Sequence, residues 1–183
     1  MLDMKKIEKY LPYVLMGIAG LIAIFSLFSA VRTIEDATFG SEAESLLGGL
    51  KAILGGNVEA IGDEKVSFSF LNLLAFFLPA LAAGGFAFIV FKAPNHKPLL
   101  VLTSVLLTVS FLLAWIFLSN MIYNLNGDGG TTILRAKAIF PDVVKLGFGT
   151  VMGIIFSIIG LLASGFHTFL LVKDDFVTVK AEQ

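Results

Sequence analysis

Four long uncharged stretches dominate the chain, and no Asp, Glu, Lys or Arg lies inside any of them. A helix needs about 20 predominantly apolar residues to cross the hydrocarbon core of a bilayer, and each stretch reaches that length. Core helices of soluble proteins rarely carry apolar runs of this length. The pattern therefore predicts four membrane-spanning helices, over residues 11–31, 66–91, 98–122 and 146–172.

The predicted fold is an all-α membrane protein, an antiparallel four-helix transmembrane bundle. With 183 residues the chain has little left outside the four spans, so residues 1–183 form a single four-pass domain. Lys5, Lys6 and Lys9 precede the first span as they would a signal peptide. Because the first apolar run exceeds the length typical of a signal peptide, we expect this span to be retained.

The segment between the first two spans, residues 32–65, shows an amphipathic pattern. Ser41 and Glu44 have the spacing of a capping box at a helix start, and Gly55 follows as a stop signal. Apolar side chains recur between them at spacings typical of a helix, at Ala43, Leu46, Leu47, Leu50, Ile53 and Leu54. The pattern predicts a helix over residues 41–54. This helix either lies on the outer membrane surface or caps the bundle; alternatively, it docks a partner or covers a pore.

The distribution of charge indicates an orientation. Lysines precede the first span, and Lys92 and Lys97 lie at the two ends of the short link between the second and third spans. In residues 32–65, by contrast, acidic residues outnumber basic ones. The positive-inside rule then favours cytoplasmic termini and two outward loops in the plasma membrane. Arg135, Lys137 and Lys145 in the second outward loop weaken this contrast.

Part of the chain resembles another part of itself. Residues 65–92 align without a gap with residues 145–172. The identities include Phe76 with Phe156, Leu81 with Leu161, Ala83 with Ala163, Gly85 with Gly165 and Phe86 with Phe166. A duplicated two-helix hairpin would explain them, and so would the shared apolar composition of two spans.

Composition narrows the class of function. A hydrophobic fraction of 57%, 15% charged residues and a mean hydropathy of +0.91 fit a membrane protein. The net charge of −1 gives no reason to expect nucleic acid as a partner. The chain has no cysteine, which excludes disulfides and thiolate metal sites, and its two histidines are isolated, so we expect neither a metal nor a cofactor.

The last span carries a line of small residues that we call the seam: Gly149, Gly153, Ser157, Gly160 and Ser164. At 100° per residue these positions fall on one side of a helix, where another helix can approach closely. The contact is expected inside the chain's own bundle. Self-association or binding of another membrane protein is the alternative.

Few polar side chains lie inside the spans, and three are candidates for a polar site: Asn72, Thr108 and His167. Intramembrane Asn, Thr and His residues usually bond to a neighbouring helix or to their own backbone. His167 is the ionisable member, so it is the candidate for a functional role. Pro79 removes a hydrogen bond in the middle of the second span and predicts a kink.

The function predicted first is that of a non-catalytic accessory or scaffolding subunit acting through helix and outer-loop contacts with lipid, other membrane proteins or itself. The alternative is a small oligomeric channel or transporter, with Thr103, Ser104, Thr108 and Ser110 along a pore. The order of loop lengths resembles that of claudin-like tetraspans. Residues 32–65 contain neither the cysteine pair nor the tryptophan of that family, so no family is assigned.

Overall fold

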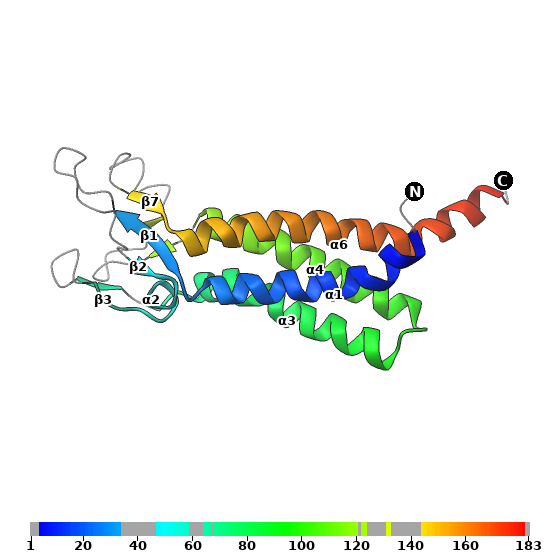
Figure 1. Cartoon of the computed structure of the whole chain (residues 1–183), viewed down its shortest axis with the longest axis horizontal. Helices are drawn as coiled ribbons and strands as arrows, with labels where there is room; N and C mark the ends of the chain where they lie inside the picture. Colours follow the sequence, from blue (N-terminus) through cyan, green and yellow to red (C-terminus); the bar gives the residue numbers. More distant parts are fainter. Residues whose placement is uncertain are drawn as a thin grey trace.

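The structure is a computed structural model that describes residues 4–33, 47–58, 64–66, 68–120, 122–123, 131–132 and 144–181. Four helices lie along one another in an elongated bundle (Figure 1): α1 (Met4–Phe25), α3 (Phe70–Lys92), α4 (Lys97–Ser119) and α6 (Phe148–Ala181). A short helix, α2 (Gly49–Leu54), lies at one end of the bundle beside the strands. We call this end the loop end.

Neighbouring helices in the bundle run in opposite directions. Helix α1 packs against α3 and α6, and α4 packs against the same two helices. The start of α1, the end of α6 and the turn between α3 and α4 lie together at the other end of the bundle (Figure 1), which we call the turn end. The described helices therefore form a packed antiparallel bundle.

Three of the helices are long and apolar enough to cross a membrane. They are α3, α4 and the Phe148–Lys173 part of α6, and α1 adds a shorter apolar segment, Lys9–Phe25. Large side chains such as Phe76, Phe86 and Phe111 are fully buried between the helices, while many other Phe, Leu and Ile side chains point outward. An apolar exterior around a packed interior is expected where lipid is the solvent. The protein is a multi-pass membrane protein.

The loop end contains short strands that the sequence pattern did not predict. Strand β1 (Ser29–Thr33) lies between β2 (Leu47–Gly48) and β7 (Val144–Leu146) in an antiparallel sheet. Two further antiparallel pairs join β3 (Gly56–Val58) with β4 (Glu64–Val66) and β5 (Ile122–Tyr123) with β6 (Thr131–Thr132). The helical prediction thus holds for the bundle, whereas the described segments of the loop end form short paired strands in addition to α2.

The first helix ends earlier than predicted. Residues 11–31 were expected to be helical, but α1 ends at Phe25, and the chain turns through Ser26 before entering β1. The Ser26 hydroxyl donates to the Ala23 carbonyl at 2.7 Å and so satisfies a backbone group at the helix end. At about 1.5 Å per residue the apolar segment of α1 is about 25 Å long, slightly less than a typical hydrocarbon core of about 30 Å.

The other helix boundaries also shift because strands occupy the ends of the predicted spans. Helix α3 begins at Phe70. The Ser69 hydroxyl caps it by accepting a hydrogen bond from the backbone N–H of Asn72 at 3.3 Å. Helix α4 ends at Ser119, and the fourth helix begins at Phe148 and continues to Ala181. One terminal residue of each of these predicted spans lies in a strand: Val66 in β4, Ile122 in β5 and Leu146 in β7.

Of the amphipathic helix predicted over residues 41–54, the structure describes only residues 47–54. The structure shows a helix over Gly49–Leu54, whereas Leu47 and Gly48 lie in strand β2. The proposed capping box of Ser41 and Glu44 falls outside the described residues. Gly49 donates from its backbone N–H to the Phe28 carbonyl at 2.7 Å, and this contact ties the start of α2 to the segment between α1 and β1.

The two aligned segments of the sequence match in the environment of some identical pairs and differ in others. Phe86 is fully buried, whereas its counterpart Phe166 is 42% exposed. Leu81 points outward, whereas Leu161 packs against the core. Gly85 and Gly165 both face open space, as shared composition alone would allow. Phe68 and Phe148 are both exposed, and Ala83 and Ala163 both pack in or against the core, so the identities include equivalent packing positions as well as different ones.

Candidate functional site

The seam of α6 faces the inside of the bundle. All five of its residues, Gly149, Gly153, Ser157, Gly160 and Ser164, are buried. A Cβ atom added at Gly153 would lie 2.8 Å from Cδ1 of Leu118, and one added at Gly160 would lie 2.5 Å from Cε1 of Phe111. Both contacts are with α4, so the seam is part of the interface between α4 and α6.

The seam accepts large side chains over most of its length. At Gly153 and Gly160 the nearest atoms belong to a leucine side chain and an aromatic ring, not to the backbone of α4. At Gly149 the nearest atom is the Phe25 backbone carbonyl oxygen, at the end of α1. Ser157 and Ser164 donate to carbonyls of their own helix, at 2.7 and 3.2 Å. The missing side chains therefore create holes in the core that bulky residues fill, which favours dense packing.

The two helices that meet at the seam also share a polar cluster. The Ser104 hydroxyl of α4 lies 2.9 Å from Nδ1 of His167 and 2.8 Å from the hydroxyl of Thr168, both on α6. Thr168 in turn bonds to the Ser164 carbonyl at 2.9 Å. We call Ser104, His167 and Thr168 the hydroxyl–histidine cluster.

An aromatic ring from a third helix completes the surroundings of this cluster. The Phe86 ring of α3 meets the His167 ring edge to face, with ring centres 5.4 Å apart. His167 is 5% exposed, and Ser104 is fully buried. The cluster thus joins α3, α4 and α6 where the bundle excludes solvent, and each hydrogen bond within it is correspondingly costly to leave unmade.

The other hydroxyl groups proposed to line a pore bond to their own helix. Thr103 donates to the Leu99 carbonyl at 2.8 Å, and Thr108 donates to the Ser104 carbonyl at 2.9 Å. Ser110 donates to the Leu107 carbonyl at 2.7 Å. Thr108, a candidate for the polar site, is therefore half-buried beside the cluster and supports the backbone of Ser104 without bonding across to another helix.

Asn72 lies far from this cluster, at the loop end. Its side chain is buried and donates from Nδ2 to the Ala52 carbonyl of α2 at 2.8 Å. Ser69 donates its backbone N–H to the Ile53 carbonyl at 2.9 Å, beside the same contact. The three polar candidates therefore do not form one site: Asn72 holds α2 on α3 at the loop end, Thr108 lies halfway along α4, and His167 lies toward the turn end.

Helix α3 runs without interruption through Pro79, the predicted kink position. The outward side of α3 beyond this proline borders an apolar groove of about 460 Å³ between α3 and α4. Gly84 and Gly85 have no atom within 4 Å of an added Cβ, so the side of α3 that carries them is not packed against the rest of the bundle, although the adjacent Ala83 and Phe86 are buried. The groove is lined by Leu81, Ala82 and Gly85 of α3 and by Thr103, Leu106 and Ser110 of α4, among others.

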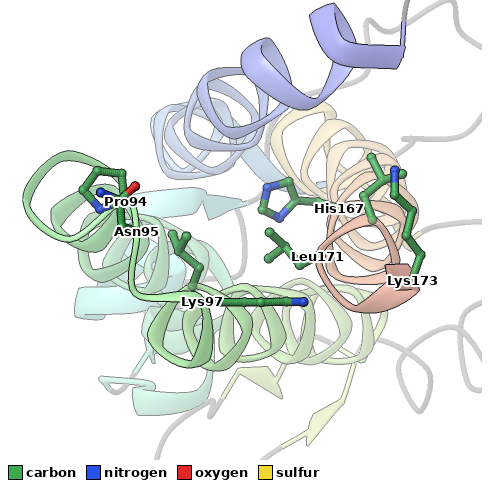
Figure 2. A pocket seen from close by; sticks show the side chains of 8 residues that line it. Pro94, Asn95, Lys97, His167, Leu171 and Lys173 are labelled. Atoms are coloured by element: carbon green, nitrogen blue, oxygen red, sulfur yellow. The ribbon is translucent and has the colours of Figure 1, made fainter. Parts of the chain in front are cut away.

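A second pocket of about 460 Å³ lies at the turn end. It lies between the α3–α4 turn with the start of α4 and the last apolar turns of α6 (Figure 2). Its lining combines polar side chains with apolar ones: Asn95, Lys97, His167 and Lys173 with Pro94, Leu100, Leu170 and Leu171. One side of the hydroxyl–histidine cluster therefore borders a cavity.

Sequence reasoning found His167 but missed its partners. Ser104 was grouped with the hydroxyls of α4, and Thr168 was not singled out. A signal was present, because Ser104 and Thr108 are one turn apart on α4 and Ser164, His167 and Thr168 are within one turn on α6. Pairing the two sets requires the rotation of each helix, which the uniform apolar composition of the spans does not reveal.

Within the described part of the chain, no group of three or more His, Asp or Glu side chains is placed to hold a metal ion. Comparison of the chain with protein-family models, curated proteins and solved structures finds no match.

Proposed function

We propose that this protein is a non-catalytic accessory or scaffolding subunit that binds another membrane protein. The observation that carries the proposal is the apolar groove between α3 and α4, which is bordered by the unpacked Gly85. Small residues on a lipid-facing helix allow a partner helix to approach closely and gain dispersion contacts that lipid chains make less well. The seam on α6 cannot serve this purpose, because α4 fills it.

The loop end offers a second surface for such a partner. Helix α2 buries Ala52 and Ile53 against the bundle, while Leu50 is 42% exposed and Leu54 is 65% exposed. The bond from Asn72 to Ala52 holds α2 in this position. An exposed apolar strip on a fixed helix is typical of a contact surface for a protein or for the membrane interface.

The proposal that the protein is not an enzyme is supported by the burial of its one serine–histidine pair among the described side chains. Ser104 and His167 have the composition of a nucleophile and its base. Ser104 is fully buried, however, and its hydroxyl also bonds to Thr168. His167 borders the pocket at the turn end, but Ser104 is not among the residues that line that pocket.

We further propose that α1 is the fourth membrane-spanning helix and that the turn end faces the cytoplasm at the plasma membrane. Its apolar segment lies alongside α3 and α6 within the bundle, so its exposed side chains meet the same surroundings as theirs. Lysines at the start of α1 and in the α3–α4 turn support this orientation.

The association proposal is tested by comparing two glycine variants in native membranes. Gly85→Leu adds a side chain in the groove, and Gly165→Leu adds the same side chain on α6 at a position that also has no atom within 4 Å. Both variants should fold. We expect the unmodified protein and Gly165→Leu to be cross-linked into a larger complex, and Gly85→Leu to lose it.

A protein that remains a single chain in membranes and in mild detergent would contradict the proposal. The channel or transporter alternative would be favoured by ion or solute flux through liposomes that contain this protein alone. Loss of that flux in Thr108→Leu would then place the path along α4.

A further inference from the structure

The pocket at the turn end has the chemistry of a site for an anionic amphiphile. It is lined by two lysines and an asparagine together with leucines from α4 and α6. The cations attract a phosphate, and the leucines provide a surface for the apolar part of the same molecule. We propose that this pocket binds the phosphate-bearing headgroup of an anionic membrane phospholipid.

The position of the pocket along the bundle fits the headgroup region of a bilayer. Lys97 is the first residue of α4, and Lys173 is the first charged residue after the apolar run of α6. Both lysines line the pocket, so its rim is where charge resumes on two helices. Leu100 and Leu170 lie on the apolar side of that boundary and line the same pocket. A lipid bound there would keep its acyl chains beside the bundle.

The arrangement of the side chains supports a defined site over a diffuse attraction to the surface. Figure 2 shows the Lys97 side chain extending from the start of α4 in the direction of α6, with His167 and Leu171 directed into the space between the helices. His167 is 5% exposed and is held at Nδ1 by Ser104, so one wall of the pocket is fixed by the bundle itself. Asn95 adds an amide donor from the turn.

The lining also distinguishes a lipid from a soluble phosphate. A site for free phosphate is usually built from backbone N–H groups and charged side chains that surround the ion. Here about half of the lining residues are apolar, which would give a small anion no favourable contact. The bound species is therefore expected to need both its phosphate and its chains.

The test measures binding of phosphatidylglycerol to the purified full chain in detergent by native mass spectrometry. Phosphatidylcholine is the zwitterionic comparison, and glycerol phosphate is the headgroup without chains. We expect phosphatidylglycerol to bind more tightly than phosphatidylcholine, and glycerol phosphate not to compete. The double variant Lys97→Gln/Lys173→Gln should bind phosphatidylglycerol about 25-fold more weakly, since each lysine near an anionic surface contributes about fivefold.

The matched control removes the same amount of charge at the same end of the bundle. Lys6 and Lys92 are exposed and do not line the pocket, so Lys6→Gln/Lys92→Gln should bind phosphatidylglycerol almost as the unmodified protein does. The charge-conserving pair Lys97→Arg/Lys173→Arg should also retain binding. It tests the site even where the glutamine variant folds poorly.

Three results would overturn the proposal. Equal binding of phosphatidylglycerol and phosphatidylcholine would show that the phosphate charge is not recognised. Equal losses in the pocket and control double variants would show a general surface effect. Competition by glycerol phosphate at the concentration of the lipid would assign the pocket to a soluble anion.

Discussion

Phe111 of α4 fills the space that Gly160 of α6 leaves open. The ring is fully buried, and three of its atoms lie within 3.0 Å of the point where a Cβ of residue 160 would be. The fit explains why a small residue is needed at that depth of α6, since any larger side chain would displace an aromatic ring from the core.

Replacing this glycine should loosen the bundle. We expect Gly160→Leu to lower stability by about 1–3 kcal/mol, because overpacking forces the Phe111 ring or the helices apart. Thermal unfolding in detergent measures the change. Gly165→Leu is the control, because an added Cβ there meets no atom within 4 Å. Equal tolerance of both substitutions would mean that the α4–α6 interface is packed differently.

A second glycine is required by backbone contact at the loop end. A Cβ at Gly147 would lie well under 3.0 Å from the Ser29 carbonyl oxygen, and Gly147 itself donates to the Ala30 carbonyl at 2.7 Å. We expect Gly147→Ala to cost about 1–3 kcal/mol in thermal unfolding, because β1 and the start of α6 must separate. Gly20→Ala adds the same methyl group into open space within α1 and should be neutral or stabilise by up to about 1 kcal/mol. A neutral Gly147→Ala would show that the two segments can move apart freely.

One substitution can remove the side-chain hydrogen bond that joins α3 to α2. Asn72→Ala deletes the bond to the Ala52 carbonyl and leaves a buried acceptor unpaired, at a cost of about 1–3 kcal/mol. Hydrogen exchange should become faster across Gly49–Leu54 while the membrane helices stay protected. Asn120→Ala is the control, because that amide bonds to its own helix at an exposed position. Unchanged exchange in Asn72→Ala would mean that apolar contacts alone hold α2.

The hydroxyl–histidine cluster should contribute more to stability than a hydroxyl that bonds within one helix. Ser104→Ala removes both contacts with α6 and should cost about 0.6 kcal/mol, the average for hydrogen bonds between membrane helices, and at most about 1.7 kcal/mol. Ser110→Ala removes a bond to the Leu107 carbonyl of the same helix and should be close to neutral in the same unfolding assay. Equal effects would show that the cluster adds nothing to the α4–α6 interface.

The proposed orientation has a direct test with fusion reporters. A reporter at Gln183 should be cytoplasmic and one at Gly129 should be external, because the lysine-rich turn end is placed inside by the positive-inside rule. The reverse pattern would invert the topology. Finding both reporters on the same side would remove one of the four proposed spans.

The helices were predictable because uncharged runs of this length have few alternatives to a membrane helix. The residues at which each helix begins and ends were less predictable. Whether residues 26–33 continue α1 or form β1 depends on pairing with β7, which lies near the far end of the chain. The sequence around Ser29 carries no sign of that partner. The spacing of the seam residues predicted that they lie on one side of the helix. It did not predict that Phe111 and Leu118 are the side chains that fill the seam.

Pairing of β1 with β7 has a consequence for synthesis. Strand β1 follows the first helix, and Gly147, Phe148 and Thr150, which bond to Ser29 and Ala30, belong to the last quarter of the chain. A ribosome delivers the earlier segment long before its partner, and the cost of closing so long a loop falls on a late step. Strand β1 therefore has no β7 to pair with until the start of the fourth helix is synthesised, and a chain truncated before residue 144 would leave the edge of β1 opposite β2 without a partner strand.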